Sequence, residues 1–239
     1  MRALICLFWL GVCLFAQVKR PVEEFPTNRG VVKITLIRHA SLMIEGGGQV
    51  IHVDPTGQGN YEGLPQADLI LITHSHGDHM DSKLVARLKK TATVILGPEV
   101  VAKTIQETTL IAAGGARTIG PWQVEVVPAY NLKRERAPGQ PFHPKGEGVG
   151  YVLGYGGKRF YIAGDTEGIP EMKALKNIDV AFLPMNQPYT MLPEEAAEAV
   201  RAFQPKIVYP YHYRGTDLTV FEKALAGAKT EVRLRDWYY

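Results

Sequence analysis

The sequence predicts an α/β (α+β) protein in which two β-sheets pack face to face with helices on the outside. Runs rich in β-branched and aromatic residues alternate with helical patterns in two successive halves of the chain. One run, residues 67–74, is apolar almost throughout, as in a strand that is buried on both faces. The 239 residues, 46% of them hydrophobic and 21% charged, have the composition of an ordinary folded protein with a sizeable core.

The first residues differ from the rest of the chain. Arg2 precedes an uncharged apolar run from Ala3 to Ala16, which is short for a membrane span and ends in a small residue. We therefore predict a signal peptide at residues 1–16 and a secreted or periplasmic protein with no stable membrane insertion after cleavage. A buried N-terminal helix and an uncleaved anchor are the alternatives. Residues 17–30 are expected to form a linker, and residues 31–239 a single domain.

Charge and cysteine content exclude several classes of function. A net charge of +3 is too small to indicate nucleic-acid binding, so we expect a small-molecule substrate. Both cysteines, Cys6 and Cys13, lie inside the apolar N-terminal run. The mature chain would have no thiol, and a metal would have to be held by histidine and carboxylate side chains.

Strand and helix patterns can be assigned along the domain in order. Glycines 46–48 are expected to form a hairpin turn, and residues 131–148, rich in glycine, proline and charge, an irregular loop. Asp81 or Ser82 is the expected N-cap of the first helix. The expected strands are 32–38, 41–47, 49–55, 67–74, 122–130, 158–165, 179–184, 206–210 and 230–236, and the expected helices are 81–90, 98–107, 169–175, 193–203 and 218–227.

The stretch "THSHGDH" at residues 73–79 carries the strongest chemical signal. His74 and His76 follow a buried strand at positions i and i+2, where side chains point to the same side and can bind one Zn²⁺-like ion. Asp78 and His79 come after Gly77, whose flexible backbone would direct them to a second point nearby. Polar residues that close a buried apolar strand usually have a function.

This stretch resembles the first ligand motif of the metallo-β-lactamase superfamily. "AGDT" at 163–166 and "YPYHY" at 209–213 resemble its later motifs in the same order. The resemblance covers essentially the whole mature chain and implies a four-layer αββα sandwich with a dinuclear metal site at the sheet ends. It assigns Asp165 as the bridging carboxylate and His212 as the last histidine ligand.

Several motifs are most similar to one branch of the superfamily, which includes L-ascorbate-6-phosphate lactonase and the N-acylphosphatidylethanolamine phospholipase D group. The branch usually has Gly-His-Ala-Ser/Thr where this chain has Arg38–Ser41, so Arg38 replaces a glycine and His39 stays in register. His39 and Asp54 are expected to orient ligand imidazoles, or else to be simple turn and strand-end residues.

The first metal lacks a third histidine at the usual place. The superfamily supplies it just after the strand that ends near residue 130, where this chain has Asn131. An amide oxygen is a poor zinc ligand beside imidazole. We therefore predict that His143, later in the same loop, is the missing ligand and that Asn131 hydrogen-bonds a ligand or the substrate. The alternative is that His143 is an exposed loop residue.

Three other features have weaker interpretations. Tyr189 could donate a hydrogen bond to a developing oxyanion at the mouth of the site, or simply pack at the start of a loop. The charge run "LKRERA" at 132–137 is expected to be solvated, with a substrate-phosphate contact as the alternative. The C-terminal "DWYY" is expected to pack at an edge.

These residues predict a metal-dependent hydrolase with two divalent cations, zinc first and manganese or iron as alternatives. Two cations that share a water lower its pKa from 15.7 towards about 7 and so provide hydroxide. Asp78 is the expected general base and leaving-group acid. Lactone or ester hydrolysis is the first expectation and phosphodiester hydrolysis the second. A di-iron redox protein and a non-catalytic binding protein remain as alternatives on the same fold.

Overall fold

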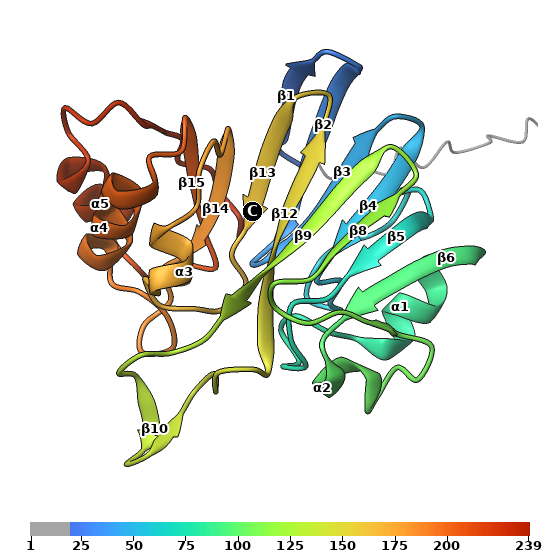
Figure 1. Ribbon diagram of the computed structural model, residues 1–239, viewed down its shortest axis with the longest axis horizontal. Helices are drawn as coiled ribbons and strands as arrows, with labels where there is room; N and C mark the ends of the chain where they lie inside the picture. Colours follow the sequence, from blue (N-terminus) through green and yellow to red (C-terminus); the bar gives the residue numbers. More distant parts are fainter. Residues whose placement is uncertain (1–19) are drawn as a thin grey trace, which may run out of the picture.

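Two seven-stranded sheets form the centre of the computed structural model, which describes residues 20–239 (Figure 1). The first sheet contains, in spatial order, β1 (Val22–Thr27), β2 (Gly30–Arg38), β3 (Ser41–Gly46), β4 (Gln49–Val53), β5 (Ala67–Leu71), β6 (Lys89–Gly97) and β7 (Thr109–Leu110). The second contains β16 (Glu231–Val232), β15 (Ile207–Tyr211), β14 (Val180–Pro184), β13 (Lys158–Ile162), β12 (Gly148–Tyr155), β9 (Trp122–Ala129) and β8 (Ala116–Ile119).

Both sheets are mixed in the same way. Strands β1 to β4 pair antiparallel, whereas β4, β5, β6 and β7 pair parallel. In the second sheet β8, β9, β12 and β13 pair antiparallel, and β13 to β16 pair parallel. Because parallel strands need crossover connections, helices lie beside the parallel part of each sheet.

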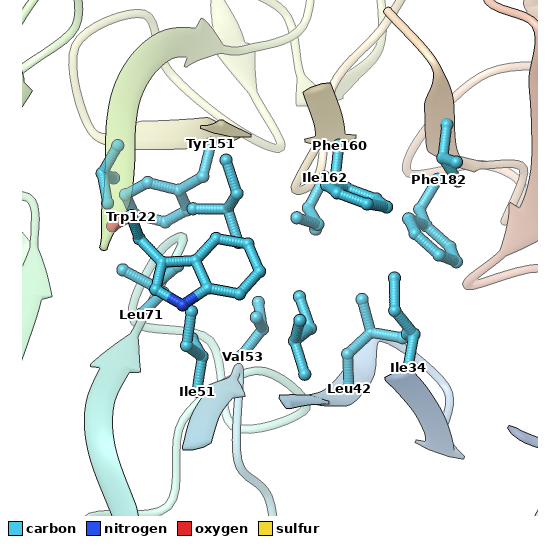
Figure 2. Close-up of a cluster of buried hydrophobic side chains, with 14 of the residues drawn as sticks. Ile34, Leu42, Ile51, Val53, Leu71, Trp122, Tyr151, Phe160, Ile162 and Phe182 are labelled. Atoms are coloured by element: carbon cyan, nitrogen blue, oxygen red, sulfur yellow. The ribbon is translucent and has the colours of Figure 1, made fainter. Parts of the chain in front are cut away.

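Three separate hydrophobic cores define four layers. The inner core joins the facing sides of the sheets, with residues such as Leu42 and Ile51 opposite Tyr151 and Phe182 (Figure 2). A second core packs α1 (Ser82–Leu88) and α2 (Glu99–Ala102) on the outer face of the first sheet. A third packs α3 (Pro170–Lys173), α4 (Pro193–Phe203) and α5 (Leu218–Ala224) on the second sheet. The predicted αββα sandwich is confirmed.

The sequence in and just after β5 is apolar without alternation because both faces of this segment are buried. Leu69 and Leu71 point into the inner core, whereas Ile70 and Ile72 point into the core under α1 and α2. Both faces of this strand are therefore removed from water, as the sequence predicts.

Some element boundaries differ from the prediction. The expected linker contains β1, an edge strand in which Phe25 joins the inner core and Pro26 is tolerated because an edge needs fewer backbone donors. The helix expected at 81–90 ends at Leu88, and the β-branched residues after it form the unpredicted strand β6. The loop expected to be irregular contains a hairpin, β10 (Glu135–Ala137) and β11 (Gln140–Pro141).

The N-terminal predictions concern residues that are mostly outside the described part of the chain. The signal peptide expected at residues 1–16 lies entirely outside it. Within residues 20–239, no helix has the length and apolar character needed to cross a membrane.

Candidate metal centre

The predicted site residues come together where strands of both sheets end. His74 follows β5, Asp165 follows β13 and His212 follows β15 directly. Ligand sites in sheets with parallel strands lie at the carboxyl ends of those strands. Asp54, His39 and Asn131 likewise follow the ends of β4, β2 and β9. The strand order therefore gathers residues that are far apart in the sequence at one edge of the sandwich.

Two groups of ligand-type atoms lie side by side. The first cluster contains His74, His76 and His143, which offer nitrogen atoms within 4.8 Å of one another. The second cluster contains Asp78, His79 and His212, together with His39, within the same limit. His143 therefore lies with His74 and His76, as predicted for the residue that completes the first cluster.

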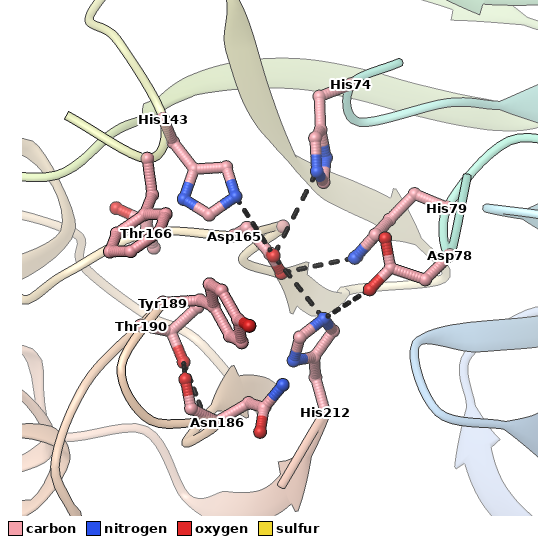
Figure 3. Close-up of polar contacts among 12 residues, drawn as sticks. His74, Asp78, His79, His143, Asp165, Thr166, Asn186, Tyr189, Thr190 and His212 are labelled. Atoms are coloured by element: carbon pink, nitrogen blue, oxygen red, sulfur yellow. Dashed lines mark hydrogen bonds and ion pairs between the residues drawn. The ribbon is translucent and has the colours of Figure 1, made fainter. Parts of the chain in front are cut away.

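Asp165 lies between the two clusters (Figure 3). Its Oδ2 is 3.2 Å from His143 Nε2, 3.9 Å from His74 Nε2 and 3.3 Å from His212 Nε2. Its Oδ1 is 3.2 Å from His79 Nε2. One carboxylate thus contacts histidines of both clusters, which is the arrangement expected of a bridging ligand.

The loop that carries His143 is fixed by Asn131 and Glu167. The Asn131 Oδ1 accepts from the His143 backbone N–H at 2.7 Å and lies 2.9 Å from His143 Nδ1. The buried Glu167 carboxylate accepts from the backbone N–H groups of Leu132, at 3.0 Å, and Arg134, at 2.9 Å. The predicted contact between Asn131 and a ligand is present, and His143 is buried, not an exposed loop residue.

Hydrogen bonds also determine how His74 and His79 present their rings. Thr73 Oγ1 donates to Asp54 Oδ2 at 2.7 Å, so it can accept from His74 Nδ1, 3.0 Å away. His79 Nδ1 lies 2.8 Å from the same Asp54 oxygen. With a proton on Nδ1, each ring directs an unprotonated Nε2 into the centre.

Several buried polar atoms of these side chains have no hydrogen-bond partner. They are His74 Nε2, His79 Nε2, Asp165 Oδ1 and both ring nitrogens of His212. Buried polar atoms are rarely left unpaired, and a group of them around one point indicates a missing ligand. Imidazole nitrogens and carboxylate oxygens without thiolates are suitable donors for Zn²⁺, and also for manganese or iron.

The charge states of the side chains favour cations at this point. Burial, reinforced by His79, holds the pKa of His74 well below its usual value, so its ring is neutral as a metal ligand requires. Burial alone would lower the pKa of His79, but Asp165 and Asp54 outweigh it and raise that pKa well above its usual value. Carboxylates that stabilise a proton on His79 stabilise a metal cation there for the same electrostatic reason.

Asp78 differs from the buried ligands because it is half-buried. Burial alone would raise its pKa, but the contacts with His212 and His39 outweigh this and hold the pKa of Asp78 well below its usual value. Its Oδ2 lies 3.1 Å from His39 Nε2 and 3.4 Å from His212 Nε2. Asp78 is therefore an ionised carboxylate at neutral pH.

Backbone strain is concentrated at the centre. His39, Asp54 and His212 have φ of 57°, 45° and 46°, in the left-handed region that non-glycine residues seldom adopt. Such strain is typical of functional sites. Arg38 is not among the residues with positive φ, so its position does not require the glycine that is usual in the related branch. Gly77 does not have positive φ either, so the turn before Asp78 does not depend on glycine flexibility, contrary to our prediction.

Tyr238 was missed by the sequence analysis, which assigned "DWYY" to edge packing. Trp237 is in fact fully buried in the inner core. The Tyr238 hydroxyl lies 2.6 Å from His39 Nδ1, and His39 in turn contacts Asp78. The end of the chain therefore supports the second cluster, and only the unusual aromatic run "WYY" hinted at such a role.

A cleft of about 480 Å³ opens onto the centre. Tyr189 lines it with its side chain partly exposed, as expected for a residue at the mouth. Arg136 also lines it, in line with the alternative of a substrate contact given for residues 132–137, whereas Gln58, Phe142, Asn186 and Arg214 were not predicted. The clusters are thus accessible to a small molecule from one side.

Comparisons with known proteins agree with this arrangement. The model of the family described as "Beta-lactamase superfamily domain" matches residues 33–212. A UPF0173 metal-dependent hydrolase of Thermococcus onnurineus is 32% identical over 216 residues, covering 84% of this chain and 95% of the relative. A relative of the same description from Lysinibacillus sphaericus is 34% identical over 194 residues, covering 76% and 85%.

A solved structure is also similar. The crystal structure of a Parabacteroides distasonis protein described as a metal-dependent hydrolase has 43% sequence identity and a TM-score of 0.86, covering 91% of this chain and 99% of that one. Similarity of this extent covers most of the described chain.

Proposed function

The chain belongs to the metallo-β-lactamase superfamily and to its metal-dependent hydrolases, and we propose that it hydrolyses an ester or lactone. The reaction would use two divalent cations, with zinc as the first candidate. The observation that carries this proposal is the pair of adjacent clusters that share Asp165. Each cluster alone offers at least three side chains of the right chemistry, and one carboxylate between them can serve two ions.

When bound, two such cations supply a water of lowered pKa and polarise the substrate oxygen. The side chains around the centre hold the metal-binding residues in place and orient their ring nitrogens. Thr73, Asp54 and Asn131 direct the Nε2 atoms of His74, His79 and His143 inward. Tyr189 lines the cleft, and its proposed role is to donate a hydrogen bond to the oxygen on which negative charge develops.

Asp78 is the proposed proton carrier. It is ionised, lines the cleft and is held by His39 and His212, so it can accept a proton from the attacking water. It then gives this proton to the alkoxide that leaves when the acyl C–O bond breaks, which restores the carboxylate. No protein nucleophile is required in this scheme.

Hydrolysis can be tested with the mature chain, stripped of metal by chelation and reconstituted with Zn²⁺ or Mn²⁺. The substrates are a panel of lactones, aryl esters, acyl-thioesters and phosphodiesters, with Asp78→Ala as the matched control. We expect metal-dependent turnover of lactones or esters that the control lacks. Turnover of phosphodiesters alone would show that the reaction is phosphodiester hydrolysis, the second candidate, and not hydrolysis of an ester or lactone. Full metal loading without turnover of any substrate would contradict the proposal.

We also propose that the protein is exported, because the apolar run from Ala3 to Ala16 has the character of a signal peptide. N-terminal sequencing of the protein from a native-like host should begin near Gln17. An intact Met1 in the cytosolic fraction would contradict export.

A further inference from the structure

Two arginines line the metal cleft without a carboxylate partner. Arg136 lies on β10 and Arg214 lies two residues after His212, so they reach the cleft from different parts of the chain. Arg136 donates to the Phe142 carbonyl oxygen at 3.0 Å, and Arg214 to Gln58 Oε1 at 3.2 Å. Within residues 20–239, neither guanidinium lies within 4.0 Å of an Asp or Glu carboxylate.

A neighbouring arginine shows the contrast. Arg134, in the same charge run as Arg136, forms ion pairs with Glu167 at 3.1 Å and Glu195 at 2.5 Å and is half-buried. Its role is to hold the loop that carries Asn131. The expectation that residues 132–137 form a solvated charge run is therefore wrong for Arg134, and Arg136 is exposed at the cleft instead.

The charges around the cleft do not balance once cations are bound. The acidic side chains that line it are Asp78, which belongs to the second cluster, and Asp165, which lies between the two clusters. The remaining lining side chains, apart from the two arginines, are neutral or histidine. A guanidinium fork binds carboxylate or phosphate oxygens well, and apart from Asp78 and Asp165 no carboxylate lines the cleft.

We propose that the substrate carries an anionic group, a carboxylate or a phosphate, that binds Arg136 and Arg214 while its ester or lactone bond lies over the metal clusters. This inference rests on the proposed hydrolase function and specifies its substrate class. The rings of Phe142 and Tyr189, 5.0 Å apart at 78°, line the same cleft and would provide an apolar wall for the connecting carbons. Figure 3 shows Tyr189 beside the clusters.

The proposal predicts a preference between esters of equal length. The probes are 4-nitrophenyl valerate, which is neutral, 4-nitrophenyl glutarate, which ends in a carboxylate, and 4-nitrophenyl 4-phosphonobutyrate. With the metal-loaded protein we expect kcat/KM for at least one charged ester to exceed that of the neutral ester by about tenfold or more. The better of the two charged esters identifies the anion. Equal kcat/KM for all three would overturn the proposal.

Arginine variants determine whether these two side chains cause the preference. Arg136→Gln and Arg214→Gln should each raise KM for the charged esters by about tenfold and leave the neutral ester unchanged. Arg117→Gln is the matched control, because Arg117 is exposed on β8, away from the cleft, and its replacement changes the net charge equally. Equal losses for charged and neutral esters in the cleft variants would contradict a role in anion recognition.

A binding measurement separates this proposal from hydrolysis itself. Calorimetric titration with glutarate monoamide and with valeramide needs no turnover. Tighter binding of the charged amide, reduced in both cleft variants but not in Arg117→Gln, would support the substrate class even if no ester is cleaved. Equal binding of the two amides would contradict the substrate class, whatever the protein hydrolyses.

Discussion

The two metal clusters differ in the chemistry of their side chains. The first contains only histidines, and a neutral amide, Asn131, stands behind His143. The second contains the carboxylate of Asp78, and another carboxylate, Asp54, stands behind His79. A carboxylate behind an imidazole raises its basicity more than an amide does. The second cluster should therefore hold its cation more tightly and also perform the proton transfer.

Support from the rest of the fold differs as well. His143 reaches the first cluster from a loop, which Glu167 fixes through backbone N–H groups. The second cluster is supported by the strained strand ends at His39 and His212 and by Tyr238 near the C-terminus. We infer that the first cluster is the adaptable side of the centre and the second the rigid side. The variants below test this difference, from the largest expected effect to the smallest.

Asp165→Asn should have the largest effect because Asp165 contacts both clusters. Its loss should reduce the metal content of both and lower turnover by about a thousandfold, since bound metal contributes several kcal/mol to catalysis. Metal analysis and initial rates, with circular dichroism to check the fold, measure this. Two metal ions and near-normal turnover in the variant would show that Asp165 does not serve both clusters.

Asp78→Ala isolates the second cluster. Removal of the proton carrier should cost at least about a hundredfold in rate, with the fold retained because the surrounding scaffold holds the other ligands. The first cluster should keep its ion, since Asp78 is not part of it. Near-normal turnover on a substrate that the wild-type protein cleaves would contradict the mechanism.

His143→Ala and Asn131→Ala form a matched pair for the first cluster. His143→Ala should remove one metal equivalent and most of the activity, whereas Asn131→Ala should keep both ions and weaken metal affinity by about tenfold, the lower end for a residue that orients a ligand. Competition with a chromogenic chelator measures both. If Asn131→Ala lost the metal and His143→Ala kept it, the amide or a water bound to it would be the ligand.

Tyr238→Phe should have the smallest effect. The hydroxyl contacts His39, which contacts Asp78, so two side chains separate it from the proposed metal position. We expect turnover to fall by about tenfold or less, with both ions retained. Tyr239→Phe is the control, because that hydroxyl donates to backbone carbonyls of β2 instead. Equal losses in both variants would indicate that the C-terminal segment matters only for stability.

Much of the fold and every side chain of the two clusters could be predicted, because the strand signals are local and the family resemblance supplies the distant residues Asp165 and His212. The strand at 67–74 is apolar on both faces, and four ligand-type residues lie at and just after its end, within positions 74–79. The structure confirms the sandwich and brings these residues together, while their binding of metal stays a prediction. β6 was missed because its first residues, Lys89 and Lys90, continue the helical pattern before them.

The remaining residues could not be read from local patterns because tertiary contacts place them. Tyr238 lies 199 positions from His39, and no spacing rule connects them. Glu167 follows the "AGDT" motif, but its backbone partners become visible only when the loop at 132–134 is folded. Arg134 and Arg136 belong to one charge run, yet one is paired with carboxylates and the other lines the cleft.

The central claim is that one chain holds two cations, one in each cluster, and the most direct test is the metal content of the folded protein. Inductively coupled plasma analysis of metal-reconstituted protein should find two equivalents per chain. Stepwise chelation should then remove the first-cluster ion before the second, because the second cluster contains a carboxylate of its own, Asp78, and has another, Asp54, behind His79. One equivalent or fewer in fully folded protein would contradict the claim.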